Sequence, residues 1–402
     1  MTWFRRLLRI DLSRRTAVAE EIPDDILAAF AGGKGLGTYY LHREVPTEAD
    51  PLGPENKVFV APGALSGTPA PAASRYEMLA KSPLTGIYLD SNSGGHFGPE
   101  LKLTGHDLFI LEGCSAQPVA VVIHDDEVQF RDAAQLWGRS VYETETALRK
   151  ELGDPRYRIA SIGPAGERLV KFACVSNDYS RQLGRGGLGA VWGSKGLKAM
   201  AALGTRTLRV AEPQAFMAAI DAALVQIFEN DWVPHKREHG TIGSLDTMHT
   251  LGITPVANFS QSVFEGIEEI DSVVFGQLVS ARLACANCAM ACSKGTRLQG
   301  SRAQDAVEGP EYETAALFGG NCLVDDPQAI IHANLICNQA GMDTISAGAL
   351  VGMVLSAGDA DRVPWADLGL SQTMDRGEMV IRLLQRIVDG EGIGQTLAGG
   401  AL

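Results

Sequence analysis

Short apolar segments of strand length, bounded by turn-forming residues, dominate the first half of the chain. They include residues 57–61, 108–112 and 119–123. Pro-Gly and Gly-Gly pairs lie between these segments, which is typical of tight turns. Helical spacing interrupts the pattern near residues 24–31 and 140–152. The sequence therefore predicts a β-rich domain over residues 1–205.

From about residue 206 the apolar positions follow helical spacing instead. The clearest helical segments are residues 213–229, 327–340, 347–357 and 379–388. A loop-rich insert is expected around residues 255–315. The predicted fold class is thus α+β, in which a mostly helical domain over residues 206–402 follows the β-rich domain.

The composition is that of an ordinary globular protein, with 45% apolar and 21% charged residues. This balance excludes disorder, a collagen repeat and a coiled coil. The 48 acidic residues outnumber the 35 basic ones and give a net charge of −13, which opposes binding to nucleic acid or to an anionic membrane surface. No stretch approaches the roughly 18 apolar residues that a membrane span needs. We therefore expect no nucleic-acid partner and no membrane partner.

Two residue counts add to this picture. Seven cysteines are an odd and sparse number for 402 residues, so the chain is no disulfide scaffold, and a reducing, cytoplasmic setting is expected. The start of the chain lacks the features of a secretion signal. Glycine is abundant, at 45 residues, which indicates many tight turns or a backbone held close to a bulky ligand.

The strongest chemical signal is a group of three cysteines, Cys285, Cys288 and Cys292, spaced C-x2-C-x3-C. At this spacing the chain can fold so that all three thiolates bind one soft metal centre. An iron–sulfur cluster is favoured over zinc, because structural zinc normally has a second matched pair and none follows here. Such a cluster usually takes four cysteines. Cys322 and Cys337 lie downstream, but both are expected to be core residues, so the fourth ligand is open.

Three glycine-rich segments are candidates for binding anions: residues 32–37, 92–98 and 184–189. The first is out of register for the G-x-G-x-x-G of dinucleotide sites. The other two can expose backbone N–H groups to anionic oxygens, and Arg185 adds a guanidinium that binds phosphate through two hydrogen bonds. Arg75 is a further candidate anion ligand. Each segment alone is typical of a plain turn, but together they indicate a large cofactor that carries phosphate.

With these residues the chain resembles the tungsten-dependent aldehyde ferredoxin oxidoreductase family over essentially its whole length. The matching motifs are residues 50–57, 81–86, 92–95, 161–167, 184–189, the three cysteines, 308–313 and 341–346. The resemblance implies that the N-terminal β-sheet domain forms the base under a pterin cofactor. Helical domains then close over that base.

The resemblance also implies the cofactors. One tungsten, or molybdenum in some relatives, is held by the dithiolenes of two molybdopterins, and a [4Fe–4S] cluster passes electrons to ferredoxin. The three cysteines would be ligands of that cluster. The residues that would contact pterin or its phosphate are Arg75, Asn92, Ser93, Gly94, Arg185, Gly186, Gly187, Asn338, Met342 and Asp343.

The implied catalytic residues lie in the segment Glu311-Tyr312-Glu313. On the residues alone, each carboxylate is typical of a solvated surface position. By the resemblance, Glu313 performs acid–base work beside the metal, Glu311 is a second candidate, and Tyr312 donates a hydrogen bond to the substrate oxygen. We expect Glu313 to be buried, with its proton affinity raised by desolvation.

The sequence departs from the family pattern in several places. The pterin motif D-x-x-G-L-[DC] occurs once, as residues 338–343, with Asn and Met replacing its first Asp and its Leu. The second copy is absent, and so are the usual fourth cluster cysteine and the histidine near the metal. The dimer-bridging E-x-x-H position reads as residues 332–335, HANL, so no bridging metal is expected and the oligomeric state is open. Residues 392–402 resemble an internal helix start, and we expect the chain to be a piece of a longer protein.

Three functions are compatible with this resemblance. The first is oxidation of a small aldehyde to a carboxylate, with electrons leaving through the [4Fe–4S] cluster to ferredoxin or an electron-transfer subunit. The second is reduction of an aromatic ring or a carboxylate by a subunit of a related complex. The third is a catalytically incomplete scaffold chain. The identity of the aldehyde and the choice between tungsten and molybdenum are open.

Overall fold

The protein is described from a computed structural model that covers residues 2–300 and 307–401. Its contacts divide the chain into two units, and each is described by itself. Unit 1 consists of Met1–Ile227, Cys285–Ala289 and Ala340–Met342. Unit 2 consists of Phe228–Ala284, Met290–Gln339 and Asp343–Leu402. Cys285 and Cys288 thus belong to the β-rich unit, whereas Cys292 belongs to the helical one.

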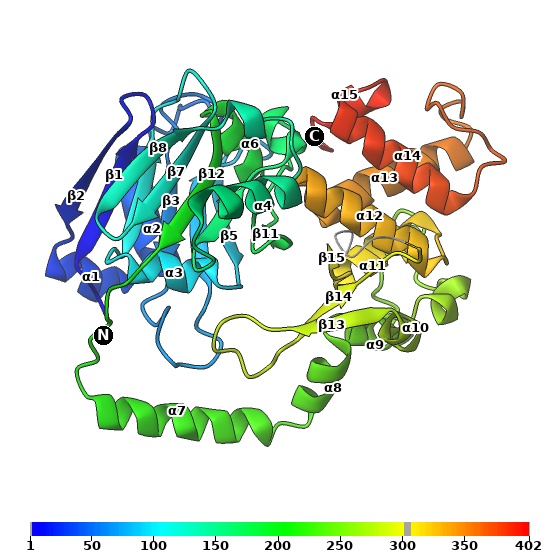
Figure 1. The fold of residues 1–402 in the computed structure, drawn as a ribbon. Helices are drawn as coiled ribbons and strands as arrows, with labels where there is room; N and C mark the ends of the chain where they lie inside the picture. Colours follow the sequence, from blue (N-terminus) through cyan, green and yellow to red (C-terminus); the bar gives the residue numbers. More distant parts are fainter. Residues whose placement is uncertain (1, 301–306, 402) are drawn as a thin grey trace. The chain divides into compact units, whose positions relative to one another are not determined.

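Unit 1 is built on two six-stranded sheets. The strands of the first are β1 (Arg6–Asp11), β2 (Thr16–Glu21), β3 (Val58–Pro62), β4 (Tyr76–Lys81), β5 (Tyr88–Ser93) and β6 (Leu108–Glu112). Those of the second are β7 (Val119–His124), β8 (Glu127–Asp132), β9 (Arg158–Ser161), β10 (Val175–Asn177), β11 (Arg181–Leu183) and β12 (Leu197–Leu203). The strand orders are β2-β1-β6-β3-β4-β5 and β11-β10-β9-β12-β7-β8 (Figure 1).

The three strands that the apolar segments predict are present as β3, β6 and β7. All five residues of β3 are buried, because the strand has apolar layers on both faces of its sheet. The edge strands β2 and β8 instead have exposed and half-buried positions along their length. Continuous apolar runs therefore correspond to central strands, and mixed runs correspond to edges.

Unit 1 also contains helices, some of which pack on the outer faces of the sheets and some of which contribute to the layer between them. They are α1 (Asp24–Phe30), α2 (Gly33–Glu44), α3 (Phe97–Leu103), α4 (Val141–Leu152), α5 (Pro164–Glu167), α6 (Leu188–Ser194) and α7 (Pro213–Phe228), with the short 3-10 helix η1 (Ala134–Leu136). The predicted helix near residues 140–152 begins at a capping box between Ser140 and Glu143 and ends at Gly153 in the left-handed conformation. Local sequence thus sets both of its ends.

Three apolar layers stack across unit 1. The largest cluster fills the space between the two sheets and includes Val60 and Val121. A second cluster includes Leu36 of α2, and a third includes Leu148 of α4. A Cβ at Gly37 would lie 2.3 Å from Cδ1 of Leu79. The first glycine-rich segment therefore begins a helix that packs closely on its sheet.

Unit 2 is mainly helical, as predicted. Its helices are α8 (Trp232–His239), α9 (Leu245–Thr250), α10 (Ser272–Gln277), α11 (Tyr312–Phe318), α12 (Pro327–Ala340), α13 (Thr344–Asp359), α14 (Arg376–Asp389) and α15 (Ile393–Leu397), with the 3-10 helices η2 (Ile242–Ser244), η3 (Glu265–Glu269) and η5 (Gly320–Cys322). The insert also forms a three-stranded sheet of β13 (Val279–Leu283), β14 (Ser293–Thr296) and β15 (Val307–Glu308).

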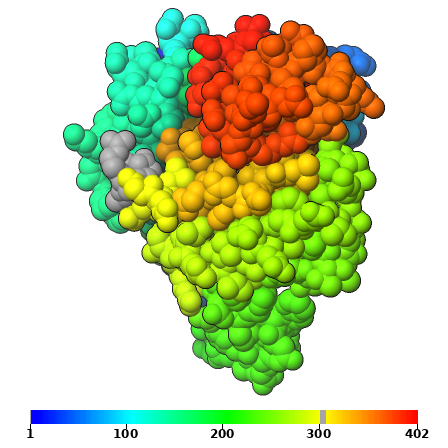
Figure 2. All heavy atoms as spheres, turned by 90° about the vertical axis from the view of Figure 1, so that its right-hand side faces the viewer, coloured from blue at the N-terminus to red at the C-terminus, as the bar shows by residue number. Residues whose placement is uncertain are grey.

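The amphipathic pattern of residues 379–388 corresponds to α14. Its buried residues recur every three to four positions and include Met379, Leu383 and Ile387. In Figure 2, the C-terminal part of the chain forms one continuous surface coloured orange to red. The α+β class is confirmed. In the described ranges, no helix combines the length and the apolar character that crossing a membrane requires.

Candidate functional site

Hydrogen bonds from the main chain and from a side chain fasten the segment Cys285–Ala289 to the rest of unit 1. The N–H of Ala286 donates to the carbonyl oxygen of Gly95 over 3.1 Å. The side chain of Asn287 donates to the carbonyl oxygen of Thr68 over 2.9 Å. Two loops of unit 1 therefore fix the backbone on which the first two predicted cluster cysteines lie.

The sulfur of Cys285 lies between a glycine and a cation. A Cβ at Gly94 would lie 2.7 Å from this sulfur, closer than real Cβ atoms approach their neighbours. Nη1 of Arg181 donates to the same sulfur over 3.1 Å. A guanidinium N–H stabilises a thiolate, which is the form of cysteine that binds metals. This environment fits a cysteine that serves as a metal ligand.

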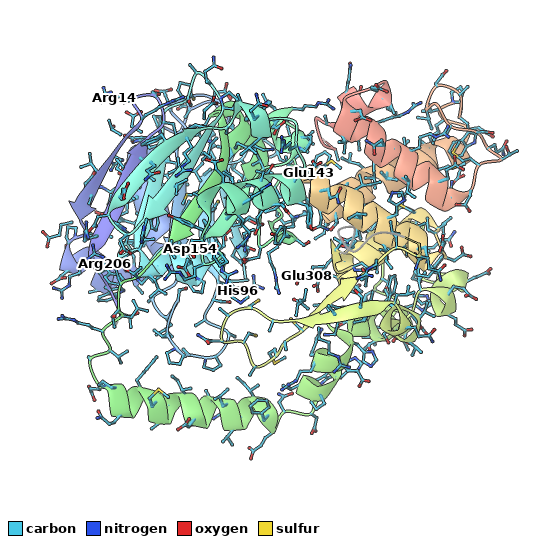
Figure 3. All side chains as sticks on the ribbon, in the orientation of Figure 1. Arg14, His96, Glu143, Asp154, Arg206 and Glu308 are labelled. Atoms are coloured by element: carbon cyan, nitrogen blue, oxygen red, sulfur yellow. The ribbon has the colours of Figure 1, made fainter. Side chains whose placement is uncertain are left out.

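A buried polar network holds the loop that carries Gly94. The side-chain amide of Asn177 donates to the carbonyl oxygen of Gly94 over 3.1 Å, and its oxygen accepts from the hydroxyl of Tyr76 over 2.9 Å. Burial raises the pKa of Tyr76 well above its usual value, so the hydroxyl keeps its proton. A carboxylate oxygen of Asp178 accepts from the N–H of His96 over 2.7 Å. Figure 3 shows His96 at the start of α3.

Glu145 of α4 contacts the residue that follows Asp178 and so stabilises the loop that carries Gly94. It is buried, pairs with Arg149 at 2.7 Å and accepts from the N–H of Tyr179 over 2.6 Å. Tyr179 directly follows Asp178 in the chain. Burial raises the pKa of Glu145 to about 7, and the nearby Arg149 opposes that increase. The support for the loop thus includes a carboxyl group that titrates near neutral pH.

Three predicted pterin residues lie together where β5 pairs with the start of β4. Nη1 of Arg75 donates to the side-chain oxygen of Asn92, and both residues are exposed. Ser93 is only 2% exposed, and its hydroxyl has no hydrogen-bond partner among the described residues. An unpaired buried hydroxyl costs about 1–3 kcal/mol. The hydroxyl of Ser93 is therefore suited to form a hydrogen bond with a polar group of a bound ligand.

The second predicted loop uses its glycines for packing inside unit 1. Gly186 and Gly187 have φ values of 89° and 92°. A Cβ at Gly186 would lie 2.0 Å from Cδ1 of Leu89, and a Cβ at Gly187 would lie 2.2 Å from the carbonyl oxygen of Lys171. Arg185, which precedes them, is exposed. Steric contacts within unit 1 explain why glycine is needed at both positions. The predicted contacts of Gly186 and Gly187 with the cofactor stay predictions.

The residues of the single pterin motif all have contacts within their own units. Asn338 is buried, and its amide donates to the main-chain and side-chain oxygens of Asn334 over 2.8 Å each. The buried Met342 forms a backbone bridge to Ala173. Asp343 caps α13 by accepting from the N–H groups of its first turn. These contacts do not test whether Asn338, Met342 and Asp343 bind the cofactor, so that assignment stays a prediction.

The burial expected for Glu313 is wrong. This residue lies in the first turn of α11 and is exposed, because the side of the helix that packs inward begins with Thr314. Glu311 is half-buried just before the helix, where its carboxylate accepts from the hydroxyl of Thr241. The same hydroxyl oxygen accepts from the N–H of Tyr312 over 3.0 Å. Thr241 therefore orients the start of the predicted catalytic segment.

Strand β14 connects Cys292 with that segment inside unit 2. Cys292 directly precedes β14, and β14 pairs with β15, which ends at Glu308 (Figure 3). The ammonium of Lys294 donates to the carbonyl oxygen of Cys292 over 3.1 Å. Burial lowers the pKa of Lys294, although nearby acidic groups oppose that change. In unit 2, Cys292 and the predicted catalytic segment Glu311–Glu313 thus flank two paired strands of one small sheet.

The core assignment of the two downstream cysteines is confirmed. Cys322 and Cys337 are both buried. Burial raises the pKa of Cys322 to about 12 and raises that of Cys337 further still. Within residues 2–300 and 307–401, no group of three or more His, Cys, Asp or Glu side chains is arranged to hold a metal ion. The three-cysteine ligand set therefore stays a prediction.

Sequence reasoning did not find the residues around Cys285. Arg181 precedes the second glycine loop, but the pattern drew attention only to Arg185. Asn177 and Asp178 end a short strand and have no motif around them. Arg181 contacts a cysteine 104 residues away, so no local pattern could reveal the contact. Each of these three residues becomes a candidate only through the tertiary structure.

Comparisons with known proteins identify the family to which the chain belongs. Residues 7–204 match the family "Aldehyde ferredoxin oxidoreductase, N-terminal domain", and residues 219–402 match "Aldehyde ferredoxin oxidoreductase, domains 2 & 3". The chain is 37% and 38% identical over 401 residues to the tungsten-containing aldehyde ferredoxin oxidoreductases of Pyrococcus furiosus and Thermococcus kodakarensis. Each alignment covers 98% of this chain and 66% of the relative, so the chain spans about two thirds of their length.

Two further similarities are broader. The chain is 30% identical over 416 residues to a Pyrococcus furiosus protein described as "Aliphatic sulfonate oxidoreductase, WOR-like subunit". A solved structure of the active-site complex BamBC of benzoyl coenzyme A reductase with 1,5-dienoyl-CoA matches with a TM-score of 0.87 and 26% identity. That match covers 100% of this chain and 62% of the other.

Proposed function

Because the chain belongs to the aldehyde ferredoxin oxidoreductase family, we propose that it forms part of an oxidoreductase that converts aldehydes to carboxylates. In this reaction an aldehyde and one water give a carboxylate, two electrons and three protons. The electrons leave one at a time through a [4Fe–4S] cluster to ferredoxin or to an electron-transfer subunit. The environment of Cys285 is the observation that carries the proposal.

The described residues fit the cofactors of this chemistry. When bound, a tungsten or molybdenum bis-molybdopterin supplies two-electron chemistry and the cluster supplies single-electron transfer. Arg75 and Asn92 would bind anionic or polar atoms of the pterin, and the unpartnered hydroxyl of Ser93 would hydrogen-bond to it. The thiolates of Cys285 and Cys288 would bind the cluster, together with Cys292.

Arg181 has a defined part in this proposal. Its guanidinium donates to the sulfur of Cys285 over 3.1 Å. A cluster gains negative charge when it is reduced, and a cation at hydrogen-bond distance from a ligand sulfur stabilises that state. Gly94 leaves room for the sulfur, because any side chain there would displace it. Together they hold the sulfur in place and favour acceptance of an electron.

In unit 2, Glu313 is assigned to proton transfer and Tyr312 to a hydrogen bond with the substrate. Glu313 is exposed and therefore free to exchange protons with water or substrate at its carboxylate. The hydroxyl of Tyr312 would donate to the aldehyde oxygen. The hydroxyl of Thr241 donates to the carboxylate of Glu311 and accepts from the N–H of Tyr312. These two hydrogen bonds orient the segment that follows β15.

Metal analysis of anaerobically purified protein tests the proposal first. We expect about one tungsten or molybdenum and about four iron atoms per chain. Aldehyde-dependent reduction of a viologen dye, measured on the same sample, tests the reaction. Protein that contains both metals but reduces no dye with aliphatic or aromatic aldehydes would contradict aldehyde oxidation. Protein without either metal would favour the scaffold function.

A reductive function is the second candidate. It is favoured by the similarity to the benzoyl coenzyme A reductase complex, whose fold this chain shares over its full length. In that case electrons would enter through the cluster and reduce an aromatic acyl thioester or a carboxylate. Incubation of metal-loaded protein with benzoyl coenzyme A and a titanium(III) reductant separates the two functions. Formation of a cyclic diene, without aldehyde-dependent dye reduction, would establish the reductive one.

A further inference from the structure

Lys294 of β14 is a buried lysine without a carboxylate partner. The residue is only 5% exposed. Its ammonium donates to the main-chain carbonyl oxygens of Ala291, Cys292 and Ser293 over 3.4, 3.1 and 3.4 Å. In the part of the chain that the structure describes, it forms no ion pair with an acidic side chain. Neutral carbonyl oxygens satisfy its N–H donors but leave its charge without a counter-ion.

The other buried lysines of the described ranges provide a comparison. Lys102 and Lys198 each form a buried ion pair with an acidic side chain. Lys195 instead donates to a main-chain carbonyl oxygen over 3.4 Å. A buried charge costs free energy unless an opposite charge lies near it. Lys294 differs from all three because its hydrogen bonds surround a predicted cluster ligand.

The turn that carries Cys292 is fixed between Lys294 and Gly240, the residue that follows α8. A Cβ at Gly240 would lie 2.5 Å from the carbonyl oxygen of Cys292, and the same oxygen accepts from Lys294. Ala291 has a φ of 43°, a left-handed conformation that residues with a side chain disfavour. The ammonium of Lys294 binds the carbonyl oxygens on both sides of this turn, so it holds Cys292 in one backbone conformation.

The electrostatic surroundings of Lys294 point to the sulfur of Cys292. Burial lowers the pKa of Lys294, and the largest effect that opposes this decrease is attraction by the Cys292 thiolate. Arg282 lies opposite Lys294 in the register of β13 and β14 and lowers the pKa further. Glu311 and Glu308 raise it by smaller amounts. The strongest negative neighbour of this lysine is therefore a predicted cluster ligand and not a carboxylate.

We propose that the iron–sulfur cluster is the counter-ion of Lys294. Lys294 is a positioning residue that acts through Cys292, because it holds the turn of this ligand and places a positive charge beside it. A cluster bound by thiolates gains negative charge on reduction, so a fixed cation favours the reduced state. The inference rests on the proposed function, which requires the cluster, and assigns to unit 2 a cation that no motif indicates.

An EPR-monitored redox titration at a single pH tests this role. The full chain is first reconstituted anaerobically with ferrous iron and sulfide. Lys294→Gln keeps a hydrogen-bond donor but removes the charge. At any fixed potential its ratio of reduced to oxidised cluster should be about tenfold lower, which corresponds to about 59 mV for one electron. Lys294→Arg keeps the charge and should restore the ratio of the unchanged chain.

Lys195→Gln is the matched control. It removes the charge of another buried lysine whose ammonium donates to a carbonyl oxygen, but outside the cysteine motif. Its ratio should stay within twofold of the unchanged chain. No change in Lys294→Gln, or equal changes in Lys294→Gln and Lys195→Gln, would overturn the proposal.

Iron content, measured on the same samples, covers the case in which a variant does not keep its cluster. Loss of iron from Lys294→Gln but not from Lys294→Arg would support the proposal, because the charge alone differs between them in kind. Loss of iron from both would overturn it, since the charge would then not suffice. An unchanged chain that takes up no iron would refute the proposed function and this inference together, whereas a cluster insensitive to Lys294 would refute the inference alone.

Discussion

Two glycine-rich segments, residues 92–98 and 184–189, have similar sequences but different surroundings. In the first, Gly94 makes room for the sulfur of Cys285, a predicted cluster ligand. In the second, Gly186 makes room for Leu89, an ordinary core residue. A glycine-rich pattern therefore indicates that something approaches the backbone closely. It does not say whether the neighbour belongs to a functional site or to the core.

The same contrast holds for the arginines beside these loops. Arg185 lies inside its glycine-rich segment, which made it the candidate from sequence, and in the structure it is exposed. Arg181 lies outside any motif and contacts the cysteine sulfur directly. The position of a charge relative to a motif is thus a weaker guide than its position in the folded protein. Substitutions can separate the two loops experimentally.

The largest effect is expected for Cys285→Ser. Replacing a thiolate ligand with a hydroxyl should remove or damage the cluster, so iron should fall from about four atoms per chain to near zero. Iron analysis and the EPR signal of the reduced cluster measure this loss. Cys114→Ser is the control, because Cys114 lies outside the motif and should leave iron unchanged. Retention of iron and signal in the Cys285 variant would refute the ligand assignment.

The next substitutions compare the two loops directly. Gly94→Ala should lower iron content, because its Cβ would lie 2.7 Å from the sulfur of Cys285. Gly186→Ala should instead lower stability by about 1–3 kcal/mol, since its φ of 89° strains any side chain. Its iron content per folded chain should not change. Metal analysis and thermal melting of both variants measure this difference between loss of iron and loss of stability. The same iron content and the same melting temperature in the two variants would contradict it.

A smaller effect is expected for Arg181→Gln. Loss of the cationic hydrogen bond should lower the midpoint potential of the cluster by on the order of 50 mV, because roughly 1 kcal/mol of differential stabilisation corresponds to about 45 mV for one electron. An EPR-monitored redox titration measures the shift. Arg185→Gln serves as the control and should leave the potential unchanged. Equal shifts in the two variants would mean that charge acts at long range rather than through the contact.

The last effect depends on pH and concerns Glu145, which supports the loop of residues 92–98 through Tyr179. Burial raises the pKa of Glu145 from its usual 4.5 to about 7, so between these values the folded chain holds a proton that the unfolded chain has lost. Stability should therefore fall as pH rises from about 4.5 through 7, by at most about 1.4 kcal/mol per pH unit. Melting temperatures of the unchanged chain and of Glu145→Gln, compared from pH 5 to 8, measure this. A pH-independent difference would contradict it.

Local sequence predicted the elements well where one physical rule dominated. The capping box of Ser140 and Glu143 and the left-handed Gly153 delimit α4 without help from the rest of the chain. The apolar run of β3 is buried on both faces, as a central strand must be. Burial of Glu313 was predicted wrongly, because its exposure depends on which face of α11 packs inward.

By itself the sequence determined the fold class, the family and the cysteine spacing, because periodicity, turn chemistry and ordered motifs act over short stretches of chain. Only the tertiary structure decided that Arg181 and Gly94 meet Cys285 and that Asn177 holds the loop that carries Gly94. These contacts join residues far apart in the chain, and they depend on how strands pair. Pairing is set by burial across the whole sheet, which no local pattern contains.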